Sequence, residues 1–286
     1  MYFNNMLLTE QELCQTLKLR LSGLYNNYEL GLLQDYILKS EWFKIYNSGI
    51  GKIGSMKLPE FKQIVDDLSS MVPVQYAIRE SDFMGLVLYV DSSVLIPRPE
   101  TEELTAWVSQ KGGNNSTLKV LDVGCGSGCI SIYLKKKHVH WKVTALDVSA
   151  LALHVAKENA TRVGVTIDFI QLDFLKEGDL ISDSFDIIVS NPPYISKEES
   201  NVMSPHTLAY EPEIALFPIG DDPLIFYKEI ALFGKSHLKP EGEIYCELNE
   251  FLVLETQEIF RLNGYRSIEI RNDMQGKSRM LKARMD

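Results

Sequence analysis

Residues 185–194 read Phe185-Asp186-Ile187-Ile188-Val189-Ser190-Asn191-Pro192-Pro193-Tyr194. The first half is an apolar run rich in isoleucine and valine, which predicts a buried β-strand. The strand must stop at Asn191, because the prolines that follow have no N–H to donate to a neighbouring strand. In open α/β sheets, ligands bind in the crevice beyond the carboxyl ends of the strands. We therefore expect the turn after this strand to face a ligand.

The residues of this turn are suited to hold a planar nitrogen group. The side-chain oxygen of Asn191 and the carbonyl oxygen of Pro192 both accept hydrogen bonds, so they match the two hydrogens of an –NH2 group. Tyr194 offers a flat face to such a group, and Pro193 stiffens the backbone before it. A strand followed by an ordinary Pro-Pro loop would give the same residues, so the interpretation needs support from elsewhere in the chain.

The composition is ordinary for a soluble globular protein, and its charge argues against nucleic acid as the main partner. The chain has 286 residues, of which 45% are hydrophobic and 24% charged, and its formal net charge is −10. Binding to duplex nucleic acid draws on lysine and arginine, whereas here acids outnumber bases. The tight basic run 135–137 falls where a helix should end, a position at which the helix dipole favours positive charge.

The sequence gives no sign of a membrane span, a signal peptide or a metal site. It has no run of about 18 apolar residues, and residues 1–6 lack the basic start of a signal peptide. The cysteines are scattered and lack the paired spacing of zinc ligands. They are Cys14, Cys125, Cys129 and Cys246. Free thiols fit a reducing compartment, so we expect a cytoplasmic protein without a metal.

The apolar pattern divides the chain into three parts. Residues 1–72 show helical spacing and a capping box from Thr9 to Glu12, which predicts a small helical domain for packing or for partner recognition. Residues 73–96 carry two short extended runs, 74–78 and 86–90, which predict a β-hairpin linker. Over residues 97–286 strands and helices alternate, as is typical of a largely parallel, helix-covered sheet.

A glycine-rich turn follows the first strand predicted in this α/β region, residues 118–123. It reads Gly124-Cys125-Gly126-Ser127-Gly128. Such glycines let a ligand approach the backbone while the N-terminus of the next helix points at it. The second strand, residues 141–147, ends at Asp147, where a carboxylate can accept both hydroxyls of a ribose. The turn and the acid together predict a nucleoside-containing cofactor.

The spacing of the glycines and the acid Asp122 favour S-adenosylmethionine over a dinucleotide. The glycines follow G-x-G-x-G and not G-x-G-x-x-G, and Asp122 lies just before them. A carboxylate there would repel a pyrophosphate but attract a cationic amino-acid group. A third strand, residues 166–171, leads to Asp173 and Phe174, which could bind the adenine amine and stack on its ring. For Phe174 a plain core position is an equal alternative.

The C-terminal part is expected to complete the sheet and to cover the site. Residues 195–223 are polar and rich in proline, and we expect a substrate-facing loop with His206 on its surface. A strand is expected over 242–248. Residues 266–270 and 278–283 are expected to pair antiparallel.

These motifs together resemble the release factor glutamine methyltransferases. The resemblance runs from about Pro73 to the C-terminus. It rests on Pro73-Val74-Gln75-Tyr76, on Ile96-Pro97-Arg98-Pro99-Glu100-Thr101-Glu102, on the turn 191–194 and on Tyr210-Glu211-Pro212. Asn-Pro-Pro-Tyr is shared with adenine and other amino-group methylases, so its combination with the arginine loop 96–102 is the more specific signal.

The resemblance implies a class I methyltransferase fold, a Rossmann-like sheet of seven strands, with an N-terminal helical domain that helps to recognise the substrate. It implies methyl transfer from S-adenosylmethionine to the side-chain nitrogen N5 of the glutamine in the Gly-Gly-Gln motif of peptide chain release factors. The positions that match cofactor contacts are Gly124, Cys125, Gly126, Ser127, Gly128, Asp147, Phe174 and Asn191. Those that match the substrate loop are Asn191, Pro192, Pro193 and Tyr194, with Asn191, Pro192 and Tyr194 expected to be catalytic.

The chain departs from the family pattern at four positions. Arg79 stands where a glycine is expected, and Ser278 stands where an aspartate is expected. Asn249 and Leu252 interrupt a Glu-Ile-Gly-x-x-Gln pattern.

Two other functions compete with this interpretation. An adenine-N6 methylase acting on DNA or RNA would use the same Asn-Pro-Pro-Tyr turn, but the acidic charge weighs against it. A binding module that has lost catalysis would keep the fold, but the intact glycine turn, Asp147 and Asn191 weigh against that loss.

Overall fold

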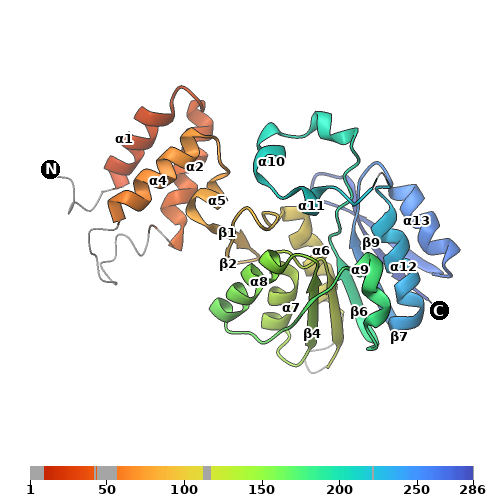
Figure 1. The fold of residues 1–286 in the computed structure, drawn as a ribbon. Helices are drawn as coiled ribbons and strands as arrows, with labels where there is room; N and C mark the ends of the chain where they lie inside the picture. The colour runs from red at the N-terminus through yellow and green to blue at the C-terminus, as the bar shows by residue number, and fades with distance from the viewer. Residues whose placement is uncertain (1–9, 42, 44–56, 112–116, 221, 286) are drawn as a thin grey trace. The chain divides into compact units, whose positions relative to one another are not determined.

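The computed structural model describes residues 10–41, 43, 57–111, 117–220 and 222–285 (Figure 1). The chain forms two compact units, Met1–Ser81 and Asp82–Asp286.

The N-terminal unit is helical, as the apolar spacing predicts. Its elements are α1 (Glu10–Leu21), α2 (Asn27–Lys39), α4 (Lys57–Ser69) and α5 (Val74–Ile78). Leucines at every fourth position of α1, such as Leu13 and Leu17, are fully buried in a core that the helices share. A capping box opens α2, where Asn26 and Glu29 bond each other's backbone N–H groups. The box predicted at Thr9 lies outside the described residues.

The strand predicted over residues 74–78 is wrong, because these residues form helix α5. Proline at position 73 is compatible with the start of a helix, and the helix buries Tyr76, Ala77 and Ile78 in succession. A short apolar run of this kind does not distinguish a strand from a helix. The hairpin instead pairs β1 (Glu80–Phe83) with β2 (Leu86–Tyr89) through a two-residue turn with positive φ at Met84 and Gly85.

The larger unit contains a seven-stranded sheet in the order β5-β4-β3-β6-β7-β9-β8. Its strands are β3 (Lys119–Val123), β4 (Lys142–Asp147), β5 (Asp168–Gln171), β6 (Phe185–Ser190), β7 (Leu238–Glu247), β8 (Ser267–Asn272) and β9 (Ser278–Arg284). The first five are parallel, and β9 lies antiparallel to both β7 and β8. The α/β fold and the antiparallel terminal pair are therefore confirmed.

Helices connect the strands and cover the sheet. They are α6 (Pro99–Ser109), α7 (Cys129–Lys137), α8 (Ala150–Val163), α9 (Phe174–Glu177), α10 (Pro205–Tyr210), α11 (Glu213–Leu216), α12 (Ile225–His237) and α13 (Val253–Leu262). The predicted loop 195–223 thus contains two short α-helices and a 3₁₀-helix (Glu199–Val202), and His206 is exposed there, as expected. Across the described part of the chain, no helix has both the length and the apolarity needed to cross a membrane.

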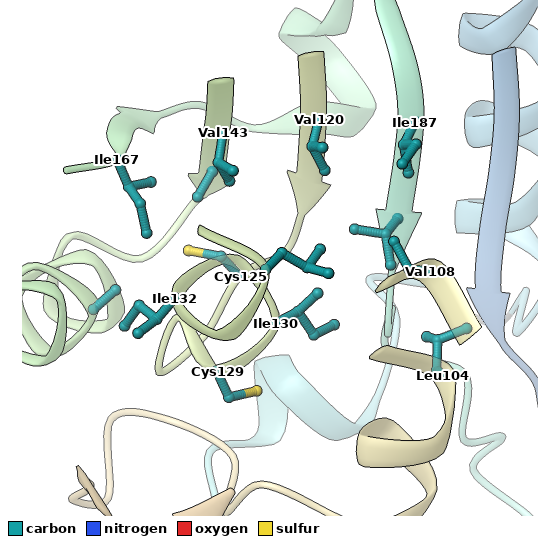
Figure 2. Close-up of a cluster of buried hydrophobic side chains, with 14 of the residues drawn as sticks. Leu104, Val108, Val120, Cys125, Cys129, Ile130, Ile132, Val143, Ile167 and Ile187 are labelled. Carbon is teal, nitrogen blue, oxygen red and sulfur yellow. The ribbon is translucent and has the colours of Figure 1, made fainter. Parts of the chain in front are cut away.

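Alternate residues of the strands enter two different cores, because successive side chains of a strand point to opposite faces. Val120 and Ile187 join the core under α6, α7 and α8, whereas Leu121 and Ile188 join the core under α12 and α13. Figure 2 shows the first core, in which Val120 and Ile187 lie opposite Ile130 of α7. Burial on both faces explains the continuous apolar runs of the central strands.

The strand order creates a crevice beside β3. The chain builds outward from β3 to β4 and β5, and then returns to place β6 on the other side of β3. The connections that leave β3 and β6 therefore diverge, and a crevice opens beyond their carboxyl ends.

Candidate active site

A cavity with about 1090 Å³ of empty space lies beyond the carboxyl ends of β3, β4, β5 and β6. Residues 124–127 line it after β3, Asp147 after β4, residues 172–175 after β5, and Asn191 and Pro193 after β6. An open crevice at this edge of the sheet is where α/β folds bind their ligands. The structure thus brings the predicted cofactor residues other than Gly128 to one cavity, although they follow four separate strands.

The glycines of the turn differ in what surrounds them. A Cβ atom added at Gly124 or Gly126 would meet no atom within 4 Å, so the backbone there is open to a ligand. A Cβ at Gly128 would lie 3.0 Å from Ile132 Cδ1 and 3.1 Å from Ala156 Cβ. The first two glycines therefore leave space in the cavity, whereas Gly128 lets α7 and α8 pack closely.

Asp147 is held rigidly at the cavity wall by backbone groups. Its Oδ2 accepts the N–H of Gly126 at 2.9 Å, and its Oδ1 accepts the N–H of Ser149 at 2.9 Å. Burial raises the pKa of Asp147, and these backbone hydrogen bonds oppose the rise. Each oxygen of a carboxylate can accept a second hydrogen bond, so Asp147 can still bind a pair of hydroxyls.

Asp122 does not line the cavity, contrary to the expectation that it would face the cofactor. Its side chain is fully buried, and Oδ2 accepts both the backbone N–H (3.2 Å) and the hydroxyl of Ser131 in α7. Among the described residues, none donates to Oδ1. Burial raises the pKa of Asp122 to about 7. Asp122 therefore stabilises the first turn of α7 through Ser131, and the glycine turn separates its carboxylate from the cavity.

The acid and the aromatic ring after β5 both line the cavity. Asp173 forms an ion pair with Lys176 at 2.7 Å, and one fifth or less of its side chain is exposed. Phe174 packs edge-on against Phe233, with ring centroids 5.2 Å apart, and is buried. Phe174 is thus a core residue that also forms part of the cavity wall.

Asn191 stands between this cavity and a second one. The second cavity has about 560 Å³ of empty space, and Pro192 and Tyr194 line it. Asn191 and Arg98 line both. The four residues of the predicted turn therefore divide, with Asn191 and Pro193 on the first cavity and Asn191, Pro192 and Tyr194 on the second.

A chain of hydrogen bonds fixes Asn191 from behind. Asn191 Nδ2 donates to Thr101 Oγ1 at 3.0 Å, and Thr101 Oγ1 donates to Glu247 Oε2 at 2.6 Å. The Tyr194 hydroxyl donates to Glu247 Oε1 at 2.9 Å. Asn249, one of the departures from the family pattern, donates from Nδ2 to the Tyr194 carbonyl at 3.1 Å. The turn is thus anchored at both of its ends.

Sequence reasoning missed Glu247 and the role of Thr101. Thr101 belongs to the arginine loop, and Glu247 is a buried acid at the end of the last parallel strand, which is the signal that could have identified it. An ion pair also connects two motifs on which the family resemblance rests, the arginine loop 96–102 and Tyr210-Glu211-Pro212. In it, Arg98 Nη2 lies 2.5 Å from Glu211 Oε1.

The cavity suits S-adenosylmethionine better than a phosphate-bearing cofactor. The carboxylates Asp147 and Asp173 line its wall, where a pyrophosphate would be repelled and a sulfonium attracted. The open positions at Gly124 and Gly126 leave room for a ligand beside the backbone. Within the described ranges, no group of three or more histidine, cysteine or acidic side chains is placed to hold a metal ion.

Comparison with known proteins decides the family. The release factor glutamine methyltransferase of Flavobacterium psychrophilum is 39% identical over 234 residues, which cover 81% of this chain and 82% of that protein. The protein of the same name from Lactococcus lactis is 39% identical over 244 residues, or 85% and 87% of the two chains. The chain belongs to the release factor glutamine methyltransferase family. It is therefore an enzyme, and its methyl donor is S-adenosylmethionine.

A family model and solved structures agree with the methyltransferase fold. The model "Methyltransferase small domain" matches residues 105–221 of the enzyme. The 16S rRNA N2 G1207 methyltransferase of Thermus thermophilus has a TM-score of 0.53 at 15% identity, covering 72% of this chain and 50% of that one. A methyltransferase from Pyrococcus furiosus has a TM-score of 0.50 at 19% identity, covering 70% and 89%. These likenesses confirm the predicted Rossmann-like methyltransferase fold.

Proposed function

We propose that the enzyme methylates the side-chain nitrogen N5 of the glutamine in the Gly-Gly-Gln motif of peptide chain release factors. Membership of the family supports the substrate class. The observation that carries the chemistry is the place of Asn191, which lies between two cavities with its Nδ2 bonded to Thr101. Among the described residues, none donates to Asn191 Oδ1, so this oxygen can accept a hydrogen bond from a substrate amide.

The first cavity holds the cofactor in this proposal. When bound, S-adenosylmethionine supplies a methyl group attached to a positively charged sulfur. Asp147 accepts the ribose hydroxyls, and the backbone at Gly124 and Gly126 lies against the ligand. Phe174 contacts the adenine ring from the cavity wall, next to the carboxylate of Asp173.

The second cavity receives the glutamine side chain. An amide nitrogen is a weak nucleophile, because its lone pair is delocalised into the carbonyl group. Asn191 Oδ1 and the Pro192 carbonyl oxygen each accept one N–H of the substrate and direct its nitrogen toward the first cavity. Orientation of this kind lowers the barrier, and the two acceptors stabilise positive charge that develops on nitrogen.

The chemistry needs no strong base before the transfer, since the proton can leave afterwards. Tyr194 is unsuited to be that base, because burial and the neighbouring Glu247 raise its pKa well above the ordinary value. Its hydroxyl is also committed to Glu247 as a donor. Tyr194 instead forms a wall of the second cavity, where its ring can pack on the planar amide.

The remaining parts of the chain have supporting roles in the proposal. The N-terminal helical unit helps to recognise the release factor, and residues 73–96 link it to the methyltransferase domain. The enzyme acts in the cytoplasm, which the four free cysteines support. Its protein substrate agrees with the net charge of −10, which disfavours a nucleic-acid target.

Mass spectrometry of a release factor after incubation with the enzyme and S-adenosylmethionine tests the proposal. We expect a single methyl group on the Gly-Gly-Gln glutamine. The variant Asn191→Ala should lose turnover by a factor of about 100 or more while still binding the cofactor in calorimetry. Asn272→Ala, at an exposed asparagine of β8 outside both cavities, is the matched control. Near-normal turnover of Asn191→Ala, or methylation of adenine in DNA or RNA instead of the release factor, would contradict the proposal.

A further inference from the structure

The orientation of the Asn191 carboxamide decides whether the proposed reaction is possible. The oxygen and the –NH2 of an asparagine side chain are similar in size but opposite in hydrogen bonding. With the oxygen toward the second cavity, Asn191 accepts a substrate N–H. With the –NH2 toward the second cavity, Asn191 would place its own N–H donors opposite the N–H donors of the substrate amide, and no hydrogen bond could form. Packing alone discriminates poorly between the two, so another group must select one.

The hydrogen-bond partners behind Asn191 make that selection. An ionised carboxylate only accepts hydrogen bonds, so Thr101 must use its single hydroxyl hydrogen to reach Glu247 Oε2, at 2.6 Å. The Thr101 oxygen then has only lone pairs left, and it can bond Asn191 only as an acceptor. Asn191 must therefore turn Nδ2 toward Thr101, where it lies at 3.0 Å, and Oδ1 away from it.

We propose that Glu247 is a positioning residue that acts through Thr101 to hold the Asn191 carboxamide with its oxygen toward the substrate. The inference rests on the proposed function. It goes further by adding two residues that act through the orientation of Asn191, Thr101 on the wall of the first cavity and Glu247 on the wall of the second. The relay joins the end of β7 to the first turn of α6 and to the end of β6.

The surroundings of the relay protect it from water. Glu247 and Thr101 are 2% and 3% exposed, so neither has bulk solvent as an alternative partner. The other oxygen of Glu247 accepts the Tyr194 hydroxyl. One carboxylate thus anchors the first and the last residue of the Asn191–Tyr194 turn, which holds the Pro192 carbonyl between two fixed points.

The charge of Glu247 sets the direction of the whole relay. Burial raises its pKa, and the hydrogen bonds from Thr101 and Tyr194 together with the positive charge of Arg279 oppose the rise, while Glu100 adds to it. A protonated Glu247 could donate to Thr101, whose hydroxyl could then donate to Asn191 Oδ1. Acidification would therefore remove the preference for the productive orientation.

Three variants test the relay by kinetics. Thr101→Val keeps the shape but removes the hydroxyl, and Thr101→Ser retains it. Glu247→Gln replaces one of the two carboxylate oxygens with an –NH2 group, so that Thr101 or Tyr194 loses its acceptor. We expect Thr101→Val and Glu247→Gln to lower kcat about 10- to 100-fold, as for loss of a hydrogen bond to a charged group. Thr101→Ser should retain most of the wild-type kcat, and the cofactor dissociation constant should stay within about twofold in Glu247→Gln, because Glu247 does not line the first cavity. The wild-type fall in kcat at acidic pH should be absent in Glu247→Gln.

Nuclear magnetic resonance gives a readout that needs neither substrate nor turnover. The side-chain –NH2 signal of Asn191, assigned by its loss in Asn191→Ala, should exchange slowly with water in the wild type and in Thr101→Ser. It should exchange rapidly in Thr101→Val. Rapid exchange in the wild type, or unchanged kcat in Thr101→Val, would overturn the relay. A wild-type enzyme that shows the protected signal but leaves release factors unmethylated would instead overturn the proposed function and leave the relay standing.

Discussion

Replacing Gly128 with alanine tests whether this glycine serves packing and not the cofactor. Gly128 has φ +79, and its added Cβ would lie 3.0 Å from Ile132 Cδ1 and 3.1 Å from Ala156 Cβ. The left-handed backbone costs about 1–2 kcal/mol for a residue other than glycine, and overpacking adds about 1–3 kcal/mol. We expect Gly128→Ala to lower the free energy of unfolding by roughly 2–5 kcal/mol.

Urea denaturation followed by tryptophan fluorescence measures this loss, because Trp107 and Trp141 are buried in the larger unit. Gly126→Ala is the matched control, since its φ is +52 but its added Cβ meets no atom within 4 Å. That variant should lose only about 1–2 kcal/mol of stability, yet bind S-adenosylmethionine more weakly. Stability of Gly128→Ala within about 0.5 kcal/mol of the wild type, or a larger stability loss in Gly126→Ala, would refute the reasoning.

Two further predictions concern buried acids. Glu211→Gln should lower the free energy of unfolding by about 1–3 kcal/mol in the same denaturation experiment. This is less than the 3–5 kcal/mol typical of a fully buried ion pair, because a third of the Arg98 side chain is exposed. An unchanged free energy of unfolding would contradict the prediction. Burial raises the pKa of Asp122 from 3.8 to about 7, so between these values the native state holds a proton that the unfolded chain has released. Wild-type stability in the absence of cofactor should therefore fall as pH rises through this window, by a few kcal/mol in total at about 1.4 kcal/mol per pH unit at most. Asp122→Asn should weaken this pH dependence, and an equal slope in the two proteins would show that Asp122 titrates normally.

Much of the sheet could be predicted, because its central strands are buried on both faces and therefore appear as continuous apolar runs. The structure places β3, β4 and β6 within one or two residues of their predicted bounds. The residues that follow these strands were predictable for the same reason, since the carboxyl ends of parallel strands meet at one edge. The glycine turn, Asp147 and Asn191 are brought together on this principle.

The predictions for residues 74–78 and for Asp122 failed because of features close to them in the sequence. Residues 74–78 form a short, largely apolar run that fits a strand or a helix, so the predicted strand rested on a pattern that does not separate the two, and packing decided for a helix. Asp122 lies in a strand buried on both faces, where the sequence does not show which side chain turns toward the cavity. The departure at Arg79 has a visible consequence, because this residue adopts φ +58 at the end of α5, a conformation that glycine adopts without steric cost.

The relay behind Asn191 was out of reach for a different reason. Thr101 and Glu247 are 146 residues apart in the chain, and Asn191 and Thr101 are 90 apart. Periodicity and turn chemistry report on neighbours in sequence, so contacts at such separations follow only from the folded sheet. The hydrogen bond from Asn249 to the Tyr194 carbonyl also joins residues that are distant in sequence. It shows what this asparagine, which the family pattern does not contain, contributes to the site.

The order in which the cavity residues occur along the chain has an evolutionary consequence. The predicted donor-binding residues other than Asn191 fall between Gly124 and Phe174, whereas the amide-binding turn and its anchor Glu247 all come later, apart from Thr101. Drift beyond residue 175, at positions that line only the second cavity, can thus remodel what is methylated while most of the donor-binding residues stay unchanged. A lineage can acquire a new acceptor without rebuilding its source of methyl groups.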